Sequence, residues 1–226
     1  MKYTVRNDLS YCVVDGHAIF LDVAADRYFH LPDHLERAFI EYVSASDRNR
    51  SPEAALVERN IMVRGEQEFR DAAQSETSAP SRSASEMAVV DTGDAVRALP
   101  EVMMTTWRCR RRIRTWPLRE VIDETLRYRA QHCSAPRTSC GAAHERRLLR
   151  AVDVFQRARL YLPLETRCLL DSLSLFRFLA RRGLDSKIVL GVTNDPFAAH
   201  CWVQSGNIVL NDTVGNAMAH TIIKVI

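Results

Sequence analysis

The sequence CLLDSLSLFRFLARRG, residues 168–183, is the stretch that decides the fold of this chain. Its apolar residues recur every three or four positions, which predicts a helix with one buried face. Thr166 is a suitable N-cap, and Gly183 after two arginines is a typical C-terminal stop. Cys168 would then lie in the first turn, where free N–H groups and the helix dipole favour a thiolate over a thiol. Such a cysteine is a candidate nucleophile, although a lone cysteine on an apolar helix is more often a small core residue.

The residues after this helix predict a small antiparallel sheet. Residues 186–193 (SKIVLGVT) are rich in β-branched side chains and predict a strand. Residues 199–204 and 207–212 flank Ser205-Gly206 and predict a hairpin. The first strand of this hairpin contains a histidine and the second ends on an aspartate, the residue types that activate a cysteine nucleophile.

The register of the hairpin decides whether the histidine and the aspartate meet. A two-residue turn would pair Gln204 with Asn207 and place Asp212 on the face opposite to His200. A three-residue loop would pair Gln204 with Ile208 and bring Asp212 directly across from His200. We predict the second register, because it builds a nucleophile, a general base and a carboxylate that orients the base.

The last third of the chain carries a spaced set of residues: Cys168-Leu169-x-x-Ser172-Leu173-x-Leu175, Gly183, Gly191-Val192, Ala199-His200-x-Trp202-Val203 and Asp212. This set resembles the B proteins of lasso-peptide biosynthesis, a family typified by the microcin J25 maturation protease. The resemblance implies a transglutaminase-like, papain-related cysteine protease fold in which Cys168, His200 and Asp212 are the catalytic residues. The sequence departs from the family at Cys201, where relatives commonly have Ala. We interpret Cys201 as a packing residue on the strand face opposite to His200.

The N-terminal third of the chain predicts a small α+β module. Residues 9–31 are typical of three antiparallel strands, with a hairpin signal at Asp15-Gly16. Three helices are expected after them, at residues 33–43, 51–60 and 66–73. This order of elements is winged-helix-like. The candidate recognition helices carry as many acids as bases, which argues against DNA binding.

The same order of elements resembles the PqqD-like leader-recognition domain that is fused to the protease in some lasso B proteins. The resemblance implies that the leader of a precursor peptide adds as a strand to the third strand and packs against the last helix. An exposed strand edge offers backbone hydrogen bonds for affinity and side-chain pockets for selectivity. For single residues such as Tyr28 and Leu31, the alternative is a plain core position. The expected leader-contacting residues are Arg27, Tyr28, Phe29, His30, Leu31 and Phe69.

Composition and motifs divide the chain into three parts. Residues 1–73 form the predicted PqqD-like leader-recognition domain, and residues 99–226 form the predicted transglutaminase-like cysteine protease domain. Residues 74–98 are dominated by Ser, Ala, Thr and acids without periodicity, which predicts a flexible linker that lets the leader-bound module deliver its substrate. The expected fold class is α+β, with a winged-helix-like module followed by helices packed on a small antiparallel sheet.

Residues 99–130 predict basic helical structure, and residues 145–164 a further helix beside the catalytic one. The basic segment fits a solvated helix face over aromatic core anchors, which is the commonest case. It also fits single-stranded nucleic-acid binding or a docking surface for an acidic partner. Its arginines are Arg108, Arg110, Arg111, Arg112, Arg114 and Arg119, and they alternate with Trp107, Ile113, Trp116 and Leu118.

Charge and cysteine usage narrow the class of protein. A net charge of +3 is too mild to argue for nucleic acid, and no apolar run approaches the roughly twenty residues of a membrane helix. Six cysteines without an export signal are typical of reduced thiols, so we expect a cytoplasmic protein. Cys133, Cys140 and His144 are spaced more widely than usual zinc ligands, so no metal site is expected.

The sequence therefore predicts a cysteine peptidase that removes the leader from a ribosomally made precursor peptide. Cys168 is the expected nucleophile and its N–H an oxyanion donor; a second donor is not identifiable from the sequence. His200 is the expected base and then acid, and Asp212 is expected to orient it. Proteolysis itself is expected to need no cofactor. The resemblance implies one protein partner, an asparagine-synthetase-like cyclase that uses ATP to close the ring after leader removal.

Two other classes of function remain open at this point. The same triad can transfer an acyl group to an amine, as in transglutaminases or arylamine acetyltransferases. The chain can also be a peptide- or DNA-binding adaptor whose protease domain has decayed. The presence of all three triad residue types argues against decay.

Overall fold

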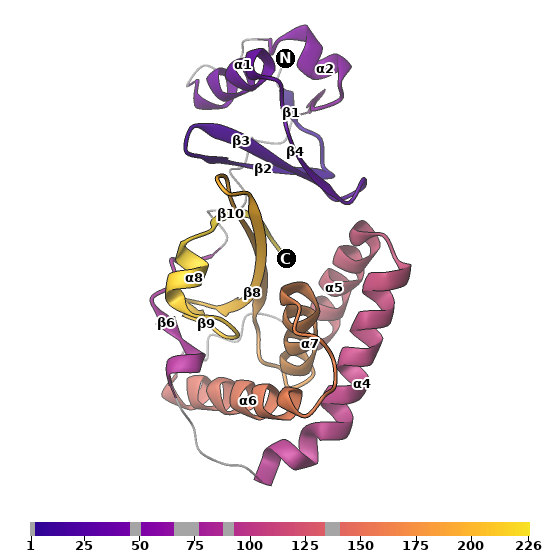
Figure 1. Ribbon diagram of the computed structural model, residues 1–226, viewed down its shortest axis with the longest axis vertical. Helices are drawn as coiled ribbons and strands as arrows, with labels where there is room; N and C mark the ends of the chain where they lie inside the picture. The colour runs from indigo at the N-terminus through magenta and orange to yellow at the C-terminus, as the bar shows by residue number, and fades with distance from the viewer. Residues whose placement is uncertain (1–2, 46–50, 66–76, 88–92, 134–140) are drawn as a thin grey trace.

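The N-terminal part of the chain is an antiparallel sheet that lies against two helices (Figure 1). The computed structural model describes residues 3–45, 51–65, 77–87, 93–133 and 141–226. The β2–β3 turn uses Asp15 and Gly16, both with positive φ, as the Asp-Gly signal predicts. The sheet has the order β2 (Leu9–Val14), β3 (His17–Asp22) and β4 (Arg27–His30), and β1 (Tyr3–Val5) pairs separately with β5 (Met62–Arg64).

Helices α1 (Asp33–Ser44) and α2 (Ala54–Glu58) cover one face of this sheet. The core between them contains Phe20 from β3 and Phe39 from α1, whose ring centroids lie 4.9 Å apart. Helix α2 is shorter than the predicted helix 51–60, because the chain turns at Asn60, which has a positive φ. The predicted helix 66–73 lies outside the described residues.

The other face of the N-terminal sheet packs directly on the C-terminal part of the chain. Cys12, Ile19 and Leu21 belong to the same apolar cluster as Leu170 and the rest of the C-terminal core. The two parts of the chain therefore share one core, and the N-terminal sheet is covered on both faces. Two polar contacts join the same parts: Lys224 Nζ donates to Ser10 Oγ at 3.1 Å, and Arg119 pairs with Asp8 at 3.1 Å.

The C-terminal part is built on a five-stranded sheet that lies beside the N-terminal one (Figure 1). Its order is β10 (Thr221–Val225), β7 (Lys187–Thr193), β8 (Ala198–Ser205), β9 (Ile208–Val209) and β6 (Arg82–Ser83). All neighbouring pairs are antiparallel except β6 with β9, which run parallel. The predicted strand 186–193 and the predicted hairpin are thus present at the centre of this sheet.

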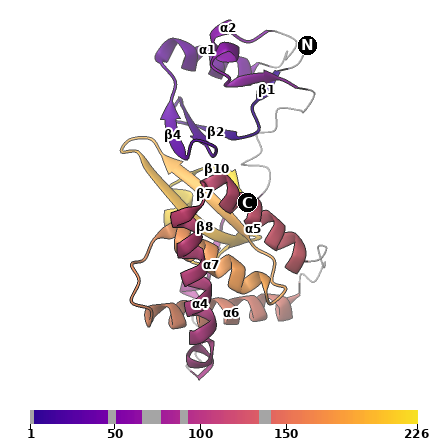
Figure 2. The same ribbon diagram turned by 90° about the vertical axis from the view of Figure 1, so that its right-hand side faces the viewer.

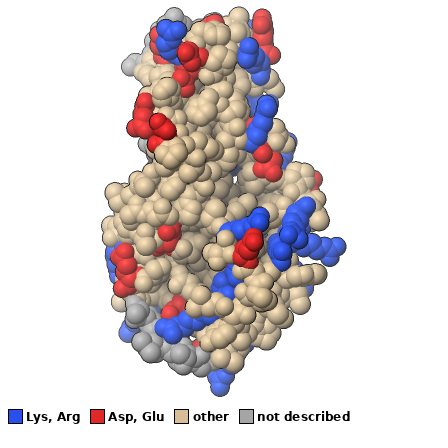
Figure 3. Space-filling model, in the orientation of Figure 1, with Lys and Arg blue, Asp and Glu red and all other residues tan. Residues whose placement is uncertain are grey.

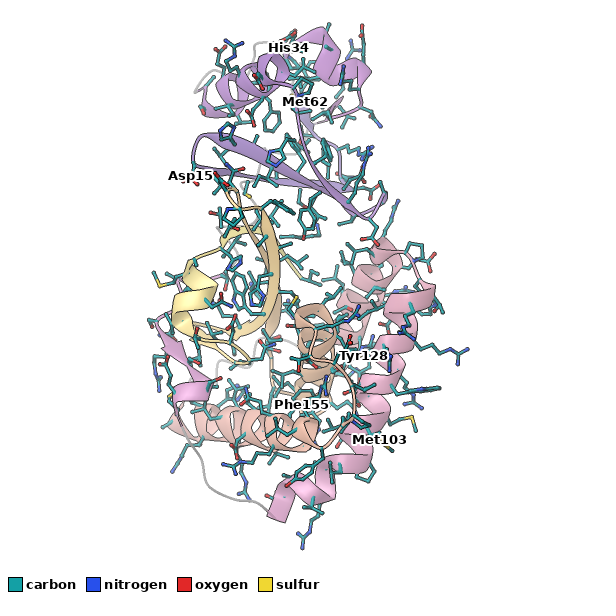
Figure 4. The ribbon with its side chains drawn as sticks, in the orientation of Figure 1. Asp15, His34, Met62, Met103, Tyr128 and Phe155 are labelled. Atoms are coloured by element: carbon teal, nitrogen blue, oxygen red, sulfur yellow. The ribbon has the colours of Figure 1, made fainter. Side chains whose placement is uncertain are left out.

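Helix α7 (Cys168–Ala180) lies at the centre of the C-terminal core, and all its residues from Leu170 onward are buried. Phe155 points into this core and contacts Phe178 of α7, with ring centroids 5.4 Å apart (Figure 4). Helix α4 runs across both α6 and α7 on the outside (Figure 2). The surrounding helices are α4 (Gly93–Thr115), α5 (Leu118–His132) and α6 (Ala142–Leu160), whereas α8 (Val214–Met218) packs on the opposite face of the sheet.

The segment expected to be a flexible linker, residues 74–98, contributes regular structure where it is described. Arg82 and Ser83 form β6 at the edge of the C-terminal sheet, followed by a short 3-10 helix at Ala84–Glu86. Helix α4 already begins at Gly93, six residues before the expected start of the helical region. The β6 pairing ties this segment to the sheet that carries the candidate site.

The predicted hairpin register is wrong by one residue. Ser205 pairs with Ile208 and Gln204 with Val209, so the turn consists of Gly206 and Asn207. Gly206 has a φ of +58°, which suits the first central position of a two-residue turn. Strand β9 then ends at Val209, and the chain leaves the ladder before it reaches the aspartate. Neither of the two registers considered from the sequence is present.

The basic segment is an exposed face of α4 and α5. Figure 3 shows basic side chains gathered on this side of the molecule. Trp107 and Met103 are also exposed on α4, at 54% and 57% of their surface, so Trp107 is not a core anchor. Arg112 pairs with Glu124 of α5, which joins the two helices. Within the described residues, no helix is both long enough and apolar enough to cross a membrane.

Candidate functional site

Cys168 is the first residue of helix α7, and it is exposed although the helix behind it is buried. The N-cap is Arg167 rather than the predicted Thr166. No side chain caps the helix from the N-cap position; instead, the Asp171 carboxylate accepts the Arg167 N–H at 3.2 Å. Arg159 pairs with the same carboxylate at 2.6 Å and fixes the loop before the helix through the Leu164 carbonyl.

His200 lies on β8, and its ring is placed between Cys168 and Asp212. Its Nε2 lies 2.5 Å from Asp212 Oδ2, which leaves Nδ1 to face the thiol. The hydrogen bond to His200 is the main cause that lowers the pKa of Cys168, while burial opposes it. The pKa of His200 is raised, first by the hydrogen bond with Cys168 and then, against burial, by Asp212. The two shifts together favour a thiolate beside an imidazolium.

The edge of β8 supplies further groups to the thiol. Strand β8 is paired with β7 along its length, but on its other edge β9 pairs only with Gln204 and Ser205, so the backbone groups of β8 that face this edge before Gln204 have no strand partner among the described residues. The backbone N–H groups of Cys201 and Leu169 both bond to the Cys168 sulfur and lower its pKa. Cys201 itself is buried, and burial raises the pKa of its thiol to about 12, so it remains an uncharged packing residue, as the sequence interpretation held.

Asn211 and Ser172 fill the rest of this open edge. Asn211 Oδ1 accepts the N–H of Val203 at 2.7 Å, in the place where a strand carbonyl would lie. Its Nδ2 donates to Ser172 Oγ at 3.0 Å, and Ser172 Oγ donates to the Cys201 carbonyl at 3.0 Å. This chain of hydrogen bonds joins helix α7, strand β8 and the residue just before Asp212.

Asp212 is fixed by four different groups. Asn216 Nδ2 donates to its Oδ2 at 2.8 Å, and the Thr213 N–H donates to its Oδ1 at 2.7 Å. Ser83 Oγ, from strand β6, donates to its backbone carbonyl at 2.6 Å. The fourth group is His200. The carboxylate is therefore oriented before any substrate binds, which is what a residue that fixes a histidine tautomer requires.

The His200 ring lies within a small aromatic group. It is stacked near Trp202, with ring centroids 6.1 Å apart, and His220 lies at 5.1 Å. Gly191 lies beneath this group on β7. A Cβ at Gly191 would come within 2.8 Å of Trp202 and 2.9 Å of His220, so no other residue fits there. His220, interpreted from the sequence as part of a tail, directly precedes β10 and lies beside the site.

The structure thus brings Cys168, His200 and Asp212 together, as the sequence analysis expected. The sequence analysis missed Asn216, Asn211 and the role of Ser83. A polar residue four positions after an aspartate and at the start of a short helix is a common pattern, so no signal in the sequence distinguishes Asn216. Ser83 lies 129 residues from Asp212, and only the β6–β9 pairing brings it near.

The expected leader-contacting residues divide between the two faces of β4. Phe29 stacks on Phe20 at 5.2 Å, with Arg27 over its ring, on the side of the N-terminal helices. Tyr28 and His30 point to the other side, where both rings contact Phe197. Leu31 is buried in the N-terminal core, and Phe69 lies outside the described residues.

The described residues contain no group of three or more His, Cys, Asp or Glu side chains that is arranged to bind a metal ion. Of the widely spaced Cys133, Cys140 and His144, the residue Cys140 lies outside the described part of the chain. Cys133 is half-buried, and burial raises the pKa of its thiol.

Comparisons with known proteins bear on the candidate site. Residues 115–224 match the transglutaminase-like superfamily, and this region contains Cys168, His200 and Asp212. A segment of 45 residues is 44% identical to the microcin J25-processing protein McjB of Escherichia coli. It covers 20% of this chain and 22% of that protein, so the chain aligns with about a fifth of the relative's length. No solved structure matches the chain significantly.

Proposed function

We propose that this protein is a cytoplasmic cysteine peptidase that cleaves the leader from a ribosomally made lasso-precursor peptide. The observation that carries the proposal is the arrangement of Cys168, His200 and Asp212, with a lowered thiol pKa and a raised imidazole pKa. The transglutaminase-like match supports it because the matched residues include Cys168, His200 and Asp212, and the similarity to a microcin J25-processing protein supports the proposed substrate class.

In the proposed reaction, the Cys168 thiolate attacks the carbonyl carbon of the scissile peptide bond. The negative charge moves to the carbonyl oxygen, where the Cys168 N–H donates a hydrogen bond from the first turn of α7. His200 then gives its Nδ1 proton to the leaving amine, and the carbon–nitrogen bond breaks to leave a thioester. A water molecule, deprotonated by His200, hydrolyses the thioester and restores the thiolate.

The proposed leader site is the free edge of β4. Among the described residues, β4 pairs only with β3, so its other edge is available to an added strand. A peptide that pairs there gains backbone hydrogen bonds without requiring any particular side chain. Arg27, Phe29 and Leu31 would contact such a strand on the side of the N-terminal helices.

The freed amine would next be joined to an acidic side chain by an asparagine-synthetase-like cyclase that uses ATP. Proteolysis by this chain would itself need no cofactor. The partner and the ATP dependence rest on the family resemblance and are part of the proposal.

The test is cleavage of the precursor peptide encoded next to this chain, followed by mass spectrometry, with and without the cyclase. We expect cleavage at one bond by the wild type and none by Cys168→Ala. Cys133→Ala is the matched control, since it removes a thiol from the far end of α5 and should retain full activity. Equal cleavage by wild type and Cys168→Ala would refute the assigned nucleophile.

A second product distinguishes the acyltransferase alternative, which the transglutaminase-like match keeps open. The same thioester can be resolved by an amine instead of water. Addition of a primary amine to the cleavage reaction would then give an amide of the N-terminal fragment. A free carboxylate as the sole product supports the peptidase.

A further inference from the structure

Tyr28, on β4, is a residue of the N-terminal sheet whose side chain faces the C-terminal part of the chain. Residues alternate between the two faces of a strand, and Tyr28 therefore points away from the N-terminal helices. It packs against the shared apolar cluster that contains Cys201 and Leu170, two residues that adjoin the site. Its ring lies 5.5 Å from that of Phe197, in the turn between β7 and β8.

The Tyr28 hydroxyl has no hydrogen-bond partner among the residues that the structure describes. It is also not one of the fully buried polar atoms that lack a partner, so it keeps some contact with solvent. A phenol that is packed by its ring and free at its hydroxyl is able to donate to a ligand from outside.

Electrostatics connect this hydroxyl to the nucleophile. Burial is the main cause that raises the pKa of Tyr28 to about 12, and the negative charge of the Cys168 thiolate adds to the shift. The phenol therefore lies within electrostatic reach of the Cys168 sulfur. It also remains protonated throughout the pH range in which a cysteine peptidase works, so it is always a donor.

We propose that the Tyr28 hydroxyl donates a hydrogen bond to a backbone carbonyl of the peptide bound at Cys168. The active site is then completed by a residue of the N-terminal sheet. The partly exposed Phe197 and the Tyr28 ring pack together just before the start of β8, the strand that carries His200. This inference rests on the proposed peptidase function, because it needs a peptide substrate.

The test compares the Tyr28→Phe variant with the wild type in two assays. Tyr28→Phe keeps the ring packing and removes only the hydroxyl. One assay measures kcat/KM for cleavage of the precursor peptide. The other measures the rate at which iodoacetamide alkylates Cys168, followed at that residue by mass spectrometry, which reports thiolate reactivity without any peptide.

Tyr128→Phe is the matched control. Tyr128 lies on α5 (Figure 4), and burial also raises the pKa of its phenol. Its ring contacts Arg177, nine residues along α7 from the nucleophile, or about 13 Å at 1.5 Å per residue. Loss of this hydroxyl should leave both assays unchanged.

We expect Tyr28→Phe to lower kcat/KM about tenfold, the effect of one hydrogen bond to the substrate, with an unchanged alkylation rate. Wild-type cleavage by Tyr28→Phe would overturn the inference and leave the peptidase assignment intact. A parallel loss of cleavage and alkylation would also overturn it, because the hydroxyl would then act on Cys168 and not on the peptide. Failure of the wild type to cleave would refute the proposed function itself.

Discussion

Asn216 Nδ2 lies 2.8 Å from Asp212 Oδ2, the same carboxylate oxygen that faces His200 Nε2. The amide also lies 3.3 Å from His200 Nε2. Asn216 therefore orients the carboxylate toward the imidazole from helix α8. Since a carboxylate oxygen accepts more than one hydrogen bond, the amide can restrict the rotation of Asp212 without displacing His200.

We predict that Asn216→Ala lowers kcat for peptide cleavage about tenfold, the effect of losing one hydrogen bond to a charged group. KM should change little, because Asn216 is argued to act through Asp212 and not on the peptide. The kcat-against-pH profile should also shift, since a less ordered Asp212 supports the imidazolium less well. An unchanged profile together with unchanged kcat would show that the Thr213 N–H and His200 suffice to fix the carboxylate.

The pH dependence of the thiol follows from the two shifts. Cys168 has a lowered pKa, so the thiolate forms as the pH rises through a value below the ordinary one of about 8.5. His200 has a raised pKa, so the imidazolium is lost only above the ordinary value of about 6.5. The rate of peptide cleavage should therefore rise and then fall with pH. Because the two groups interact, the two apparent pKa values belong to the Cys168–His200 pair and not to either residue alone.

The rate at which iodoacetamide alkylates Cys168 reports the formation of the thiolate as the pH rises. In the wild type, the rate should reach half its maximum at a pH below the ordinary pKa of a thiol. In His200→Ala, the midpoint should move up toward the ordinary thiol value, because the main cause of the lowered pKa is removed. A midpoint that does not move would mean that the backbone N–H groups alone lower the pKa.

Gly191→Ala should destabilise the fold by about 2 kcal/mol, because the new methyl group overpacks a rigid aromatic group. Its Cβ would lie 2.8 Å from Trp202 and 2.9 Å from His220, both on the His200 side of the sheet. Gly215→Ala in α8 is the control, since a Cβ there meets no atom within 4 Å. Urea denaturation of the two variants measures the difference, and equal midpoints would contradict the predicted clash.

Arg159→Ala should cost about 3 kcal/mol in the free energy of unfolding, because it leaves the Asp171 carboxylate largely buried without its partner. Peptide cleavage should fall as well, since Arg159 fixes the loop that leads into Cys168. Arg167→Ala is the comparison: it removes an exposed ion pair with Glu165 and should cost less than about 1 kcal/mol. Thermal or urea unfolding that ranks the two variants equally would contradict the structural role given to Arg159.

The catalytic helix could be predicted from the sequence because its apolar period is long and regular. Residues 168–180 present three full turns of buried side chains, and Gly183, with a positive φ, lies just after the helix. The choice of N-cap between Thr166 and Arg167 could not be predicted, since the cap depends on Asp171 and its pairing with Arg159. A hydrophobic pattern predicts the existence of a helix more reliably than the residue at which the helix begins or ends.

The meeting of His200 with Asp212 was expected, but for a reason that the structure corrects. The predicted register placed the two residues opposite each other in a ladder, whereas β9 ends before the aspartate. The Asn211 side chain accepts the Val203 N–H that a longer β9 strand would have accepted. A side chain in this role leaves no periodic pattern in the sequence. The pairing of β6 was hidden for a similar reason, because two residues are too few to show an alternation.

The β6 strand also determines where this chain could be divided into two polypeptides. Ser83 is 1% exposed and donates to the backbone of Asp212, although it precedes every helix of the C-terminal part. A separately produced C-terminal polypeptide that began at α4 would lack this strand and the hydrogen bond that Ser83 donates to the Asp212 carbonyl. Division upstream of residue 82 would retain both, and the two pieces would then have to reassociate through the apolar face of β2 and β3 to restore the shared core.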